Sequence, residues 1–151
     1  SFMLVLFPAL VEEYNTDRLK FKESFQKAVR IFSIVGGGIA AGFWYFSNGI
    51  ITLIYGEKFY PSISVLNILV FAFFLFFMNF LLSNILITSG REKLNAWNLV
   101  IATVLNILLN LALIPEYGAE GAAWATVLCE GLLIVVMSLQ IKKADPPQLG
   151  R

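Results

Sequence analysis

The chain has 151 residues, of which 58% are hydrophobic and only 14% are charged. Soluble domains carry about 25% charged residues, so this composition excludes an ordinary soluble globular protein. The net charge of +1 gives no sign of a nucleic-acid-binding surface, and no nucleic-acid partner is predicted. The absence of histidine removes the commonest metal ligand, and the single cysteine, Cys129, cannot form an internal disulfide. No cofactor and no metal site are predicted.

The first eleven residues are apolar but too short to cross a bilayer. They read SFMLVLFPALV, about half of the 20 residues that a helical span needs. They have neither the basic start nor the small-residue cleavage site of a signal peptide. We interpret 1–11 as the end of a transmembrane helix within a longer protein, with a short interfacial segment as the alternative. Residues 12–27, which carry both signs of charge, are expected to form a cytoplasmic amphipathic linker.

Four long stretches within 28–143 then carry almost no charge. Each is long enough to cross a hydrocarbon core of about 30 Å as a helix. The expected transmembrane helices cover about 28–55, 62–89, 94–114 and 119–141. Residues 144–151, with two prolines in a polar segment, are expected to form a tail after the last helix.

Lys and Arg residues collect in every second gap between these stretches. They lie in 17–30, in 91–93 and in the C-terminal tail, whereas 57–61 and 115–120 together hold only Lys58. Basic residues in short loops are retained on the cytoplasmic side of a membrane. The sequence therefore predicts a multi-pass protein of the cytoplasmic membrane, with the lipid bilayer as a partner and a cytoplasmic C-terminus.

Two sets of small residues predict close helix packing. Gly38 and Gly42 form a GxxxG pattern in the first span, and Gly121 and Ala125 lie in a run of small residues that opens the fourth. Small residues let the backbones of two membrane helices approach each other. For the glycines of the first span, bending during a transport cycle is the alternative.

The third span carries a stripe of polar side chains. At 100° per residue these side chains lie within an arc of roughly 140°. They are Asn95, Asn98, Thr103, Asn106 and Asn110. Unpaired amides are costly in hydrocarbon, so the stripe either makes hydrogen bonds between helices or lines a polar cavity. Asn98, Asn106 and Asn110 are the candidates for contact with a substrate or cavity, whereas polar residues of the second span, such as Asn79, share no narrow face and predict nothing.

Glu130 is the only charged residue in the centre of the fourth span. It shares a helix face with Ala123 and Thr126, so we expect it to point into the protein. An intramembrane carboxyl group is costly and is a functional candidate by default. Glu130 is predicted to act as a coupling acid or as a structural acid.

Catalytic motifs are absent from the sequence. A Ser–His–Asp triad is impossible without histidine, and loops of five to eight residues leave no room for a soluble catalytic domain. The chain is therefore predicted not to be an enzyme.

Four segments in order resemble one family. They are Phe7–Leu10 (FPAL), Ile54–Phe59 (IYGEKF), Thr88–Lys93 (TSGREK) and Leu105–Thr126 (LNILLNLALIPEYGAEGAAWAT). Together they resemble the C-terminal part of the polysaccharide-biosynthesis flippases, among them the O-antigen (Wzx-type) flippases. These belong to the multidrug/oligosaccharidyl-lipid/polysaccharide (MOP) exporter superfamily.

The resemblance implies an all-α integral membrane protein. Four complete transmembrane helices and the end of a fifth would form part of the second six-helix lobe of a MOP-type transporter. The implied function is translocation of a lipid-linked oligosaccharide, of the undecaprenyl-pyrophosphate type, across the cytoplasmic membrane by alternating access. The implied partners are that substrate and the rest of the transporter chain. A small four-helix homodimeric transporter and a non-transporting membrane-anchor subunit remain as alternatives.

Overall fold

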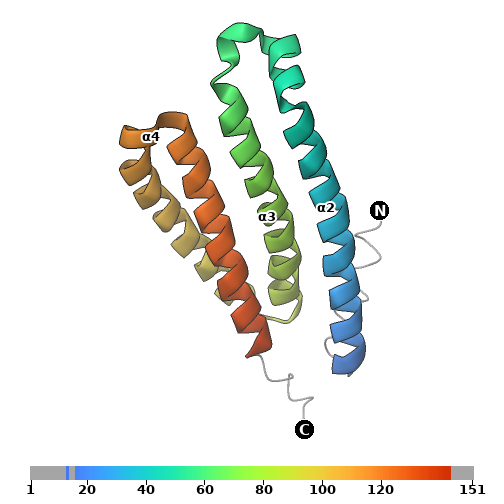
Figure 1. Cartoon of the computed structure of the whole chain (residues 1–151). Coiled ribbons are helices and arrows are strands. Elements are labelled where there is room, and N and C mark those ends of the chain that lie inside the picture. The colour runs from blue at the N-terminus through green and yellow to red at the C-terminus, as the bar shows by residue number, and fades with distance from the viewer. Residues whose placement is uncertain (1–12, 14–15, 144–151) are drawn as a thin grey trace.

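The computed structural model describes Glu13 and residues 16–143, and these form long helices joined by short turns (Figure 1). The elements are α2 (Arg18–Tyr55), the short 3-10 helix η1 (Glu57–Phe59), α3 (Ser62–Thr88) and α4 (Glu92–Lys142). Three of them are long and apolar enough to cross a membrane. The expected all-α membrane class is confirmed. The helix end expected at 1–11 and the tail expected at 144–151 lie outside the described residues.

Helix α2 is longer than the first expected span. It begins at Arg18 because Asp17 caps it: the Asp17 carboxylate accepts hydrogen bonds from the backbone N–H groups of Leu19 and Lys20, at 3.0 and 3.2 Å. Such a cap satisfies N–H groups that have no partner within the helix. Much of the segment expected as a linker, 12–27, therefore belongs to the same continuous helix as the first span.

Helix α4 consists of two arms that fold back on each other at Gly118 (Figure 1). Gly118 has φ 58° and ψ −134°, in the region that glycine adopts without steric cost. We call residues 92–117 the first arm and residues 119–142 the second arm. The sequence places a gap between two spans at 115–120; Pro115 lies inside the helix, and the turn is made at Gly118.

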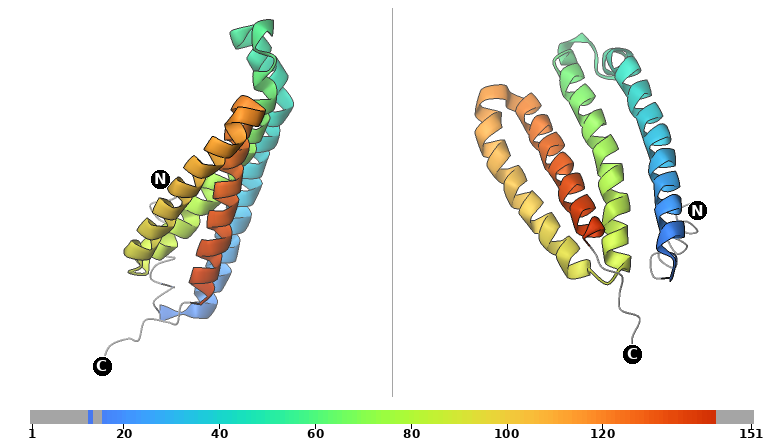
Figure 2. Two further views of the ribbon diagram at one scale, coloured as in Figure 1. Left: turned by 90° about the vertical axis from the view of Figure 1, so that its left-hand side faces the viewer. Right: turned by 60° about the horizontal axis from the view of Figure 1, so that its bottom comes forward.

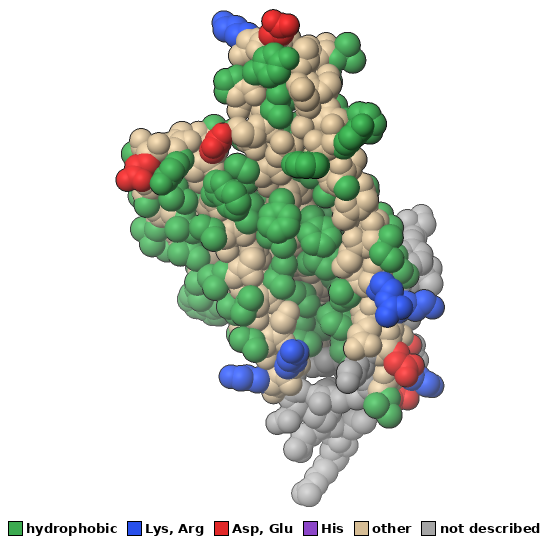
Figure 3. Space-filling model, viewed as in Figure 1, with side chains coloured by type: hydrophobic (Ala, Val, Ile, Leu, Met, Phe, Trp, Pro, Cys, Tyr) green, Lys and Arg blue, Asp and Glu red, His purple; other side chains and the backbone are tan. Residues whose placement is uncertain are grey.

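Helix α3 lies between α2 and the second arm of α4 (Figures 1 and 2). Charged side chains mark the two ends of this bundle (Figure 3). The end that we call the basic end carries Lys27, Arg30, Arg91, Lys93 and Lys142. The opposite end, which we call the acidic end, carries Glu57, Glu116 and Glu120. The helices between the two ends are apolar over a depth that suits a bilayer.

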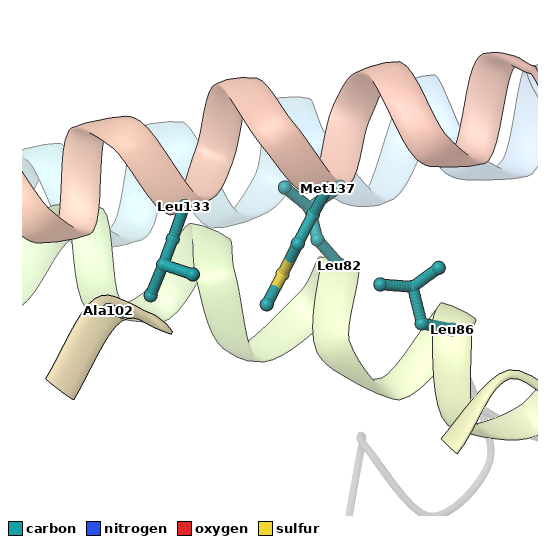
Figure 4. Packing of buried hydrophobic residues seen from close by; sticks show 5 residues of the cluster. All are labelled: Leu82, Leu86, Ala102, Leu133 and Met137. Atoms are coloured by element: carbon teal, nitrogen blue, oxygen red, sulfur yellow. The ribbon is translucent and has the colours of Figure 1, made fainter. Parts of the chain in front are cut away.

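The best-packed part of the bundle lies where α3 meets both arms of α4 (Figure 4). The cluster consists of Leu82, Leu86, Ala102, Leu133 and Met137. Met137 is 0% exposed and points from the second arm towards α3. This packing makes α3 and α4 one structural unit.

Replacing Met137 with alanine is expected to lower the free energy of unfolding by about 2–5 kcal/mol, because it opens a cavity in this cluster. Unfolding of the purified full-length protein in mixed micelles measures the change. Leu139→Ala is the control, since Leu139 lies on the same arm but is 51% exposed. Equal losses for the two variants would contradict the assignment of the core.

Candidate functional site between α3 and the arms of α4

A buried amide and a carboxyl group are in direct contact between α3 and the second arm. Asn79 lies on α3 and is 6% exposed. Its Nδ2 donates hydrogen bonds to Oε2 of Glu130, at 2.6 Å, and to the backbone oxygen of Glu130, at 2.8 Å. Because both acceptors belong to one residue, the orientation of the amide is fixed. Glu130 therefore points into the protein, as expected, and joins two helices.

The chemistry of this pair follows from its geometry. A neutral Glu130 can carry its proton on Oε1 and still accept the hydrogen bond from Asn79 on Oε2. The hydrogen bond can therefore persist whether Glu130 is ionised or neutral. Among the described residues, Oδ1 of Asn79 is buried and has no hydrogen-bond partner. An unpaired buried oxygen costs free energy, which the contact between the two helices has to offset. The pair can hold a proton without breaking the contact between α3 and α4.

A second polar cluster lies towards the basic end. Asn98 on the first arm and Gln140 on the second exchange two hydrogen bonds, at 2.7 and 2.9 Å. Arg91 donates to the backbone oxygen of Gln140 at 3.3 Å, and Ser83 donates to Oδ1 of Asn95 at 2.9 Å. Asn95 and Asn98, which both belong to the polar stripe, therefore make hydrogen bonds between helical segments.

The other two amides of the stripe lie nearer to the acidic end and are half-buried. Nδ2 of Asn110 donates to the backbone oxygen and to Oδ1 of Asn106, at 2.8 and 2.9 Å, within the first arm. The Asn106 side chain also lies close to Cys129 of the second arm. Asn110 lines a groove of about 310 Å³ whose other walls are apolar. The residues of that groove are Ile107, Asn110, Leu111, Ile114 and Pro115.

The two predicted packing faces have different surroundings. A Cβ atom added to Gly121 would lie 2.4 Å from the backbone oxygen of Leu113, so the two arms approach each other closely there, and Ala125 is 0% exposed. A Cβ atom at Gly38 or Gly42 would meet nothing within 4 Å among the described residues. Packing at Gly38 and Gly42 stays a prediction.

Sequence reasoning missed three partners in these clusters: Asn79, Ser83 and Gln140. Asn79 and Ser83 are four residues apart and so share a helix face, which is a signal that could have been used. Gln140 gives no such signal, because it stands next to the charged end of the last span. Within the part of the chain that the structure describes, no group of His, Cys, Asp or Glu residues could hold a metal ion.

Known proteins similar to this chain are membrane proteins. The model of the lipid II flippase MurJ family matches residues 1–150. An uncharacterized membrane protein of Methanocaldococcus jannaschii is 30% identical over 124 residues, which are 82% of this chain and 24% of that protein. The chain therefore spans about a quarter of the length of this relative. No solved structure matches the chain.

Proposed function

This chain belongs to the lipid II flippase MurJ family, and from that premise we propose that it is part of a transporter that moves a lipid-linked saccharide across the cytoplasmic membrane. The family is one of transporters, so the chain is not an enzyme. The match over residues 1–150 is the observation that carries the proposal, and it favours a flippase over a four-helix homodimeric transporter or an anchor subunit. The rest of the transporter would come from sequence outside this chain, since the relative is about four times longer than the matched part.

The headgroup of the substrate is the finer part of the proposal. The family description names lipid II, and we take a lipid II-type headgroup on a polyprenyl pyrophosphate as the first candidate. The motif at Leu105–Thr126 resembles the O-antigen flippases, so an O-antigen-type oligosaccharide on the same kind of lipid is the second. Both candidates are anionic amphiphiles with a polar head and a long hydrocarbon tail.

Movement of a lobe as a rigid body is the mechanism that the contacts support best. Asn79 with Glu130, Ser83 with Asn95, and Asn98 with Gln140 all hold α3 and the arms of α4 together. Alternating access is largely the rocking of one such unit against another around a fixed site. In the proposed orientation the basic end faces the cytoplasm, because basic residues in short loops are retained there.

Asn106 and Asn110 are proposed to donate hydrogen bonds to the headgroup, and Glu130 to hold a proton or to act as a structural acid. Replacing both Asn106 and Asn110 with leucine in the full-length transporter is expected to slow transport about tenfold, since two hydrogen bonds of about 0.7 kcal/mol each are lost. Transport is measured in proteoliposomes, with fluorescent lipid II and a fluorescent polyprenyl-pyrophosphate oligosaccharide as the two substrates.

Thr103→Val is the matched control for these asparagines. Thr103 is an exposed polar residue of the same arm, and its hydroxyl donates to the backbone oxygen of Leu99, at 2.8 Å, within its own helix. Transport by Thr103→Val should stay at the wild-type rate. Normal transport of both substrates by the double variant, at normal expression, would exclude Asn106 and Asn110 from the substrate path.

A further inference from the structure

Buried polar side chains between α3 and the arms of α4 follow one another from Glu130 to the basic end. Each one either hydrogen-bonds the next or lies about one helical turn from it. In this order they are Glu130, Asn79, Ser83, Asn95, Asn98 and Gln140. We call these six residues the polar seam. Its three asparagines are only 5–6% exposed, so the seam lies inside the protein.

The seam reaches the surface of the protein at Arg91. Nη1 of Arg91 donates to the backbone oxygen of Gln140 at 3.3 Å, and Arg91 lies directly before α4 at the basic end. Unlike the asparagines of the seam, Arg91 is only partly buried. The seam therefore connects the middle of the bundle with water at the basic end.

Towards the acidic end the interface beside Glu130 is apolar. On α3 every residue of 68–78 is apolar, which separates Asn79 from the next polar residue, Asn67, by a rise of about 18 Å. On the second arm the hydroxyl of Thr126 donates to the backbone oxygen of Ala122, at 3.1 Å, within its own helix. The interface between α3 and the second arm therefore continues the seam on the basic side of Glu130 and not on the acidic side.

The first arm has two amides on the acidic side of Glu130, Asn106 and Asn110. Nδ2 of Asn110 donates to Asn106 within the same arm, at 2.8 and 2.9 Å, so these two bonds do not lead to Glu130. Asn106 lies close to Cys129, which is buried but is not a member of the seam. These amides offer a competing route, which the experiment below has to exclude.

Asn79 and Ser83 together offer a place for a water molecule next to Glu130. Nδ2 of Asn79 is bonded to Glu130, whereas its Oδ1 has no hydrogen-bond partner among the described residues. Ser83 lies one turn nearer to the basic end and uses its hydroxyl hydrogen on Asn95, at 2.9 Å, so its oxygen can still accept. A water between Asn79 and Ser83 can donate to both of them. Buried waters need two to four such partners.

We propose that Glu130 exchanges its proton with the basic end through water molecules bound along the polar seam. Amide groups do not take up or release protons under physiological conditions, so the side chains hold the waters and the waters carry the proton. In one direction a water gives a proton to Oε1 of the Glu130 carboxylate and takes one from the next water, which leaves Glu130 neutral. The reverse step returns the carboxylate. The bond from Asn79 to Oε2 persists in both states.

The inference rests on the proposed function, because a proton on Glu130 matters to transport only if Glu130 is the coupling acid. In the proposed orientation the basic end faces the cytoplasm. The cytoplasm would then supply and receive this proton, whichever way the substrate cavity is open. Access from a fixed side is a property that the rocking of the lobe alone does not provide.

No other base interrupts the route. Helix α3 has no titratable residue in 62–88, and the amides of the seam do not titrate. The titratable residues of α4 besides Glu130 are Glu92, Lys93, Glu116, Tyr117, Glu120, Cys129 and Lys142. All of these except Cys129 lie at the ends of the two arms. A proton that enters beside Arg91 therefore meets Glu130 as the first base along the seam.

The test follows the infrared band of the protonated Glu130 carboxyl group in proteoliposomes of the full-length transporter. The band is assigned by its loss in Glu130→Gln. A membrane-impermeant amine reagent measures orientation, because it modifies the exposed Lys93 where the basic end faces outward and the exposed Lys58 where the acidic end does. After a pH jump in the outer solution, the fraction of Glu130 that titrates at once should equal the fraction of protein with its basic end outward.

A matched pair of variants tests the seam itself. Ser83→Val should slow the exchange about tenfold, because the water beside Glu130 loses one polar partner. Threonine has the same shape as valine but keeps the hydroxyl, so Ser83→Thr should exchange at the wild-type rate. Thr126→Val is a second control, since the Thr126 hydroxyl is bonded within its own helix, and it should also exchange at the wild-type rate.

Four results would overturn the route. They are a fast fraction that follows the outward acidic end, equal rates for Ser83→Val and Ser83→Thr, slower exchange in Asn106→Leu than in Ser83→Val, and a Glu130 that stays ionised at every pH at which the protein is folded. The first and the last use the wild type, so they do not depend on the folding of a variant.

A transport assay on the wild-type protein separates this inference from the proposed function, because the infrared measurement needs no substrate. If the wild type transports lipid II but Glu130 titrates from the acidic end, only the proton route is wrong. If the wild type transports no lipid-linked saccharide, the proposed function itself fails, and the infrared data alone decide whether the seam conducts protons.

Discussion

Gly121→Ala is expected to destabilise the transporter by about 3 kcal/mol, the upper part of the usual range for overpacking. The added methyl carbon would lie 2.4 Å from the backbone oxygen of Leu113 and 2.7 Å from its carbonyl carbon. Backbone atoms cannot rotate away as a side chain can, so the two arms of α4 would have to separate. The loss should appear as a lower yield of monodisperse full-length protein and as easier unfolding in sodium dodecyl sulfate.

Gly131→Ala is the matched control for this substitution. Gly131 lies on the same arm, and an added Cβ atom would meet nothing within 4 Å among the described residues. Alanine is favoured over glycine in a helix by about 1 kcal/mol, so this variant should be neutral or slightly more stable. If both alanine variants behaved like the wild type, the close approach of the two arms would be wrong.

The helices of this protein could be predicted from sequence because the bilayer imposes their length. Long stretches without charge had to be helical spans, and the gap at 115–120 stood where two of them had to turn. The start of α2 at Arg18 was not predicted, because charged residues were taken as the end of the helix. Hydropathy reports where a helix leaves the hydrocarbon, whereas a cap such as Asp17 reports where the helix itself begins.

Side-chain pairs were less accessible to prediction than helices. The spacing of the stripe on the first arm leads to the same prediction for Asn98 and Asn110. In the structure, Asn98 donates a hydrogen bond to Gln140 across the hairpin, whereas Asn110 donates to Asn106 within its own helix. The difference depends on which residue of the neighbouring helix lies at the same depth and faces the same way. Local sequence does not encode that register, which is also why Asn79 was not recognised as the partner of Glu130.

Replacing Asn79 with leucine is expected to cost about 2–3 kcal/mol, because the Glu130 carboxyl group then loses the donor that Asn79 supplies. Glu130→Gln should cost less than about 1 kcal/mol, because its amide oxygen can still accept the bond from Asn79. Leucine at both positions should recover most of the loss, since no polar group remains unpaired between the helices. Unfolding of the full-length protein in mixed micelles measures all three variants.

The same variants separate the two roles that Glu130 can have in transport. A structural acid only joins α3 to α4, so Glu130→Gln and the double leucine variant would both transport normally once they are folded. A coupling acid has to gain and lose a proton. Glutamine at position 130 keeps the hydrogen bond to Asn79 but cannot gain or lose a proton. Stable Glu130→Gln protein that binds the lipid-linked substrate but does not move it would therefore assign the coupling role. Wild-type transport by that variant would leave the pair with Asn79 as a structural contact.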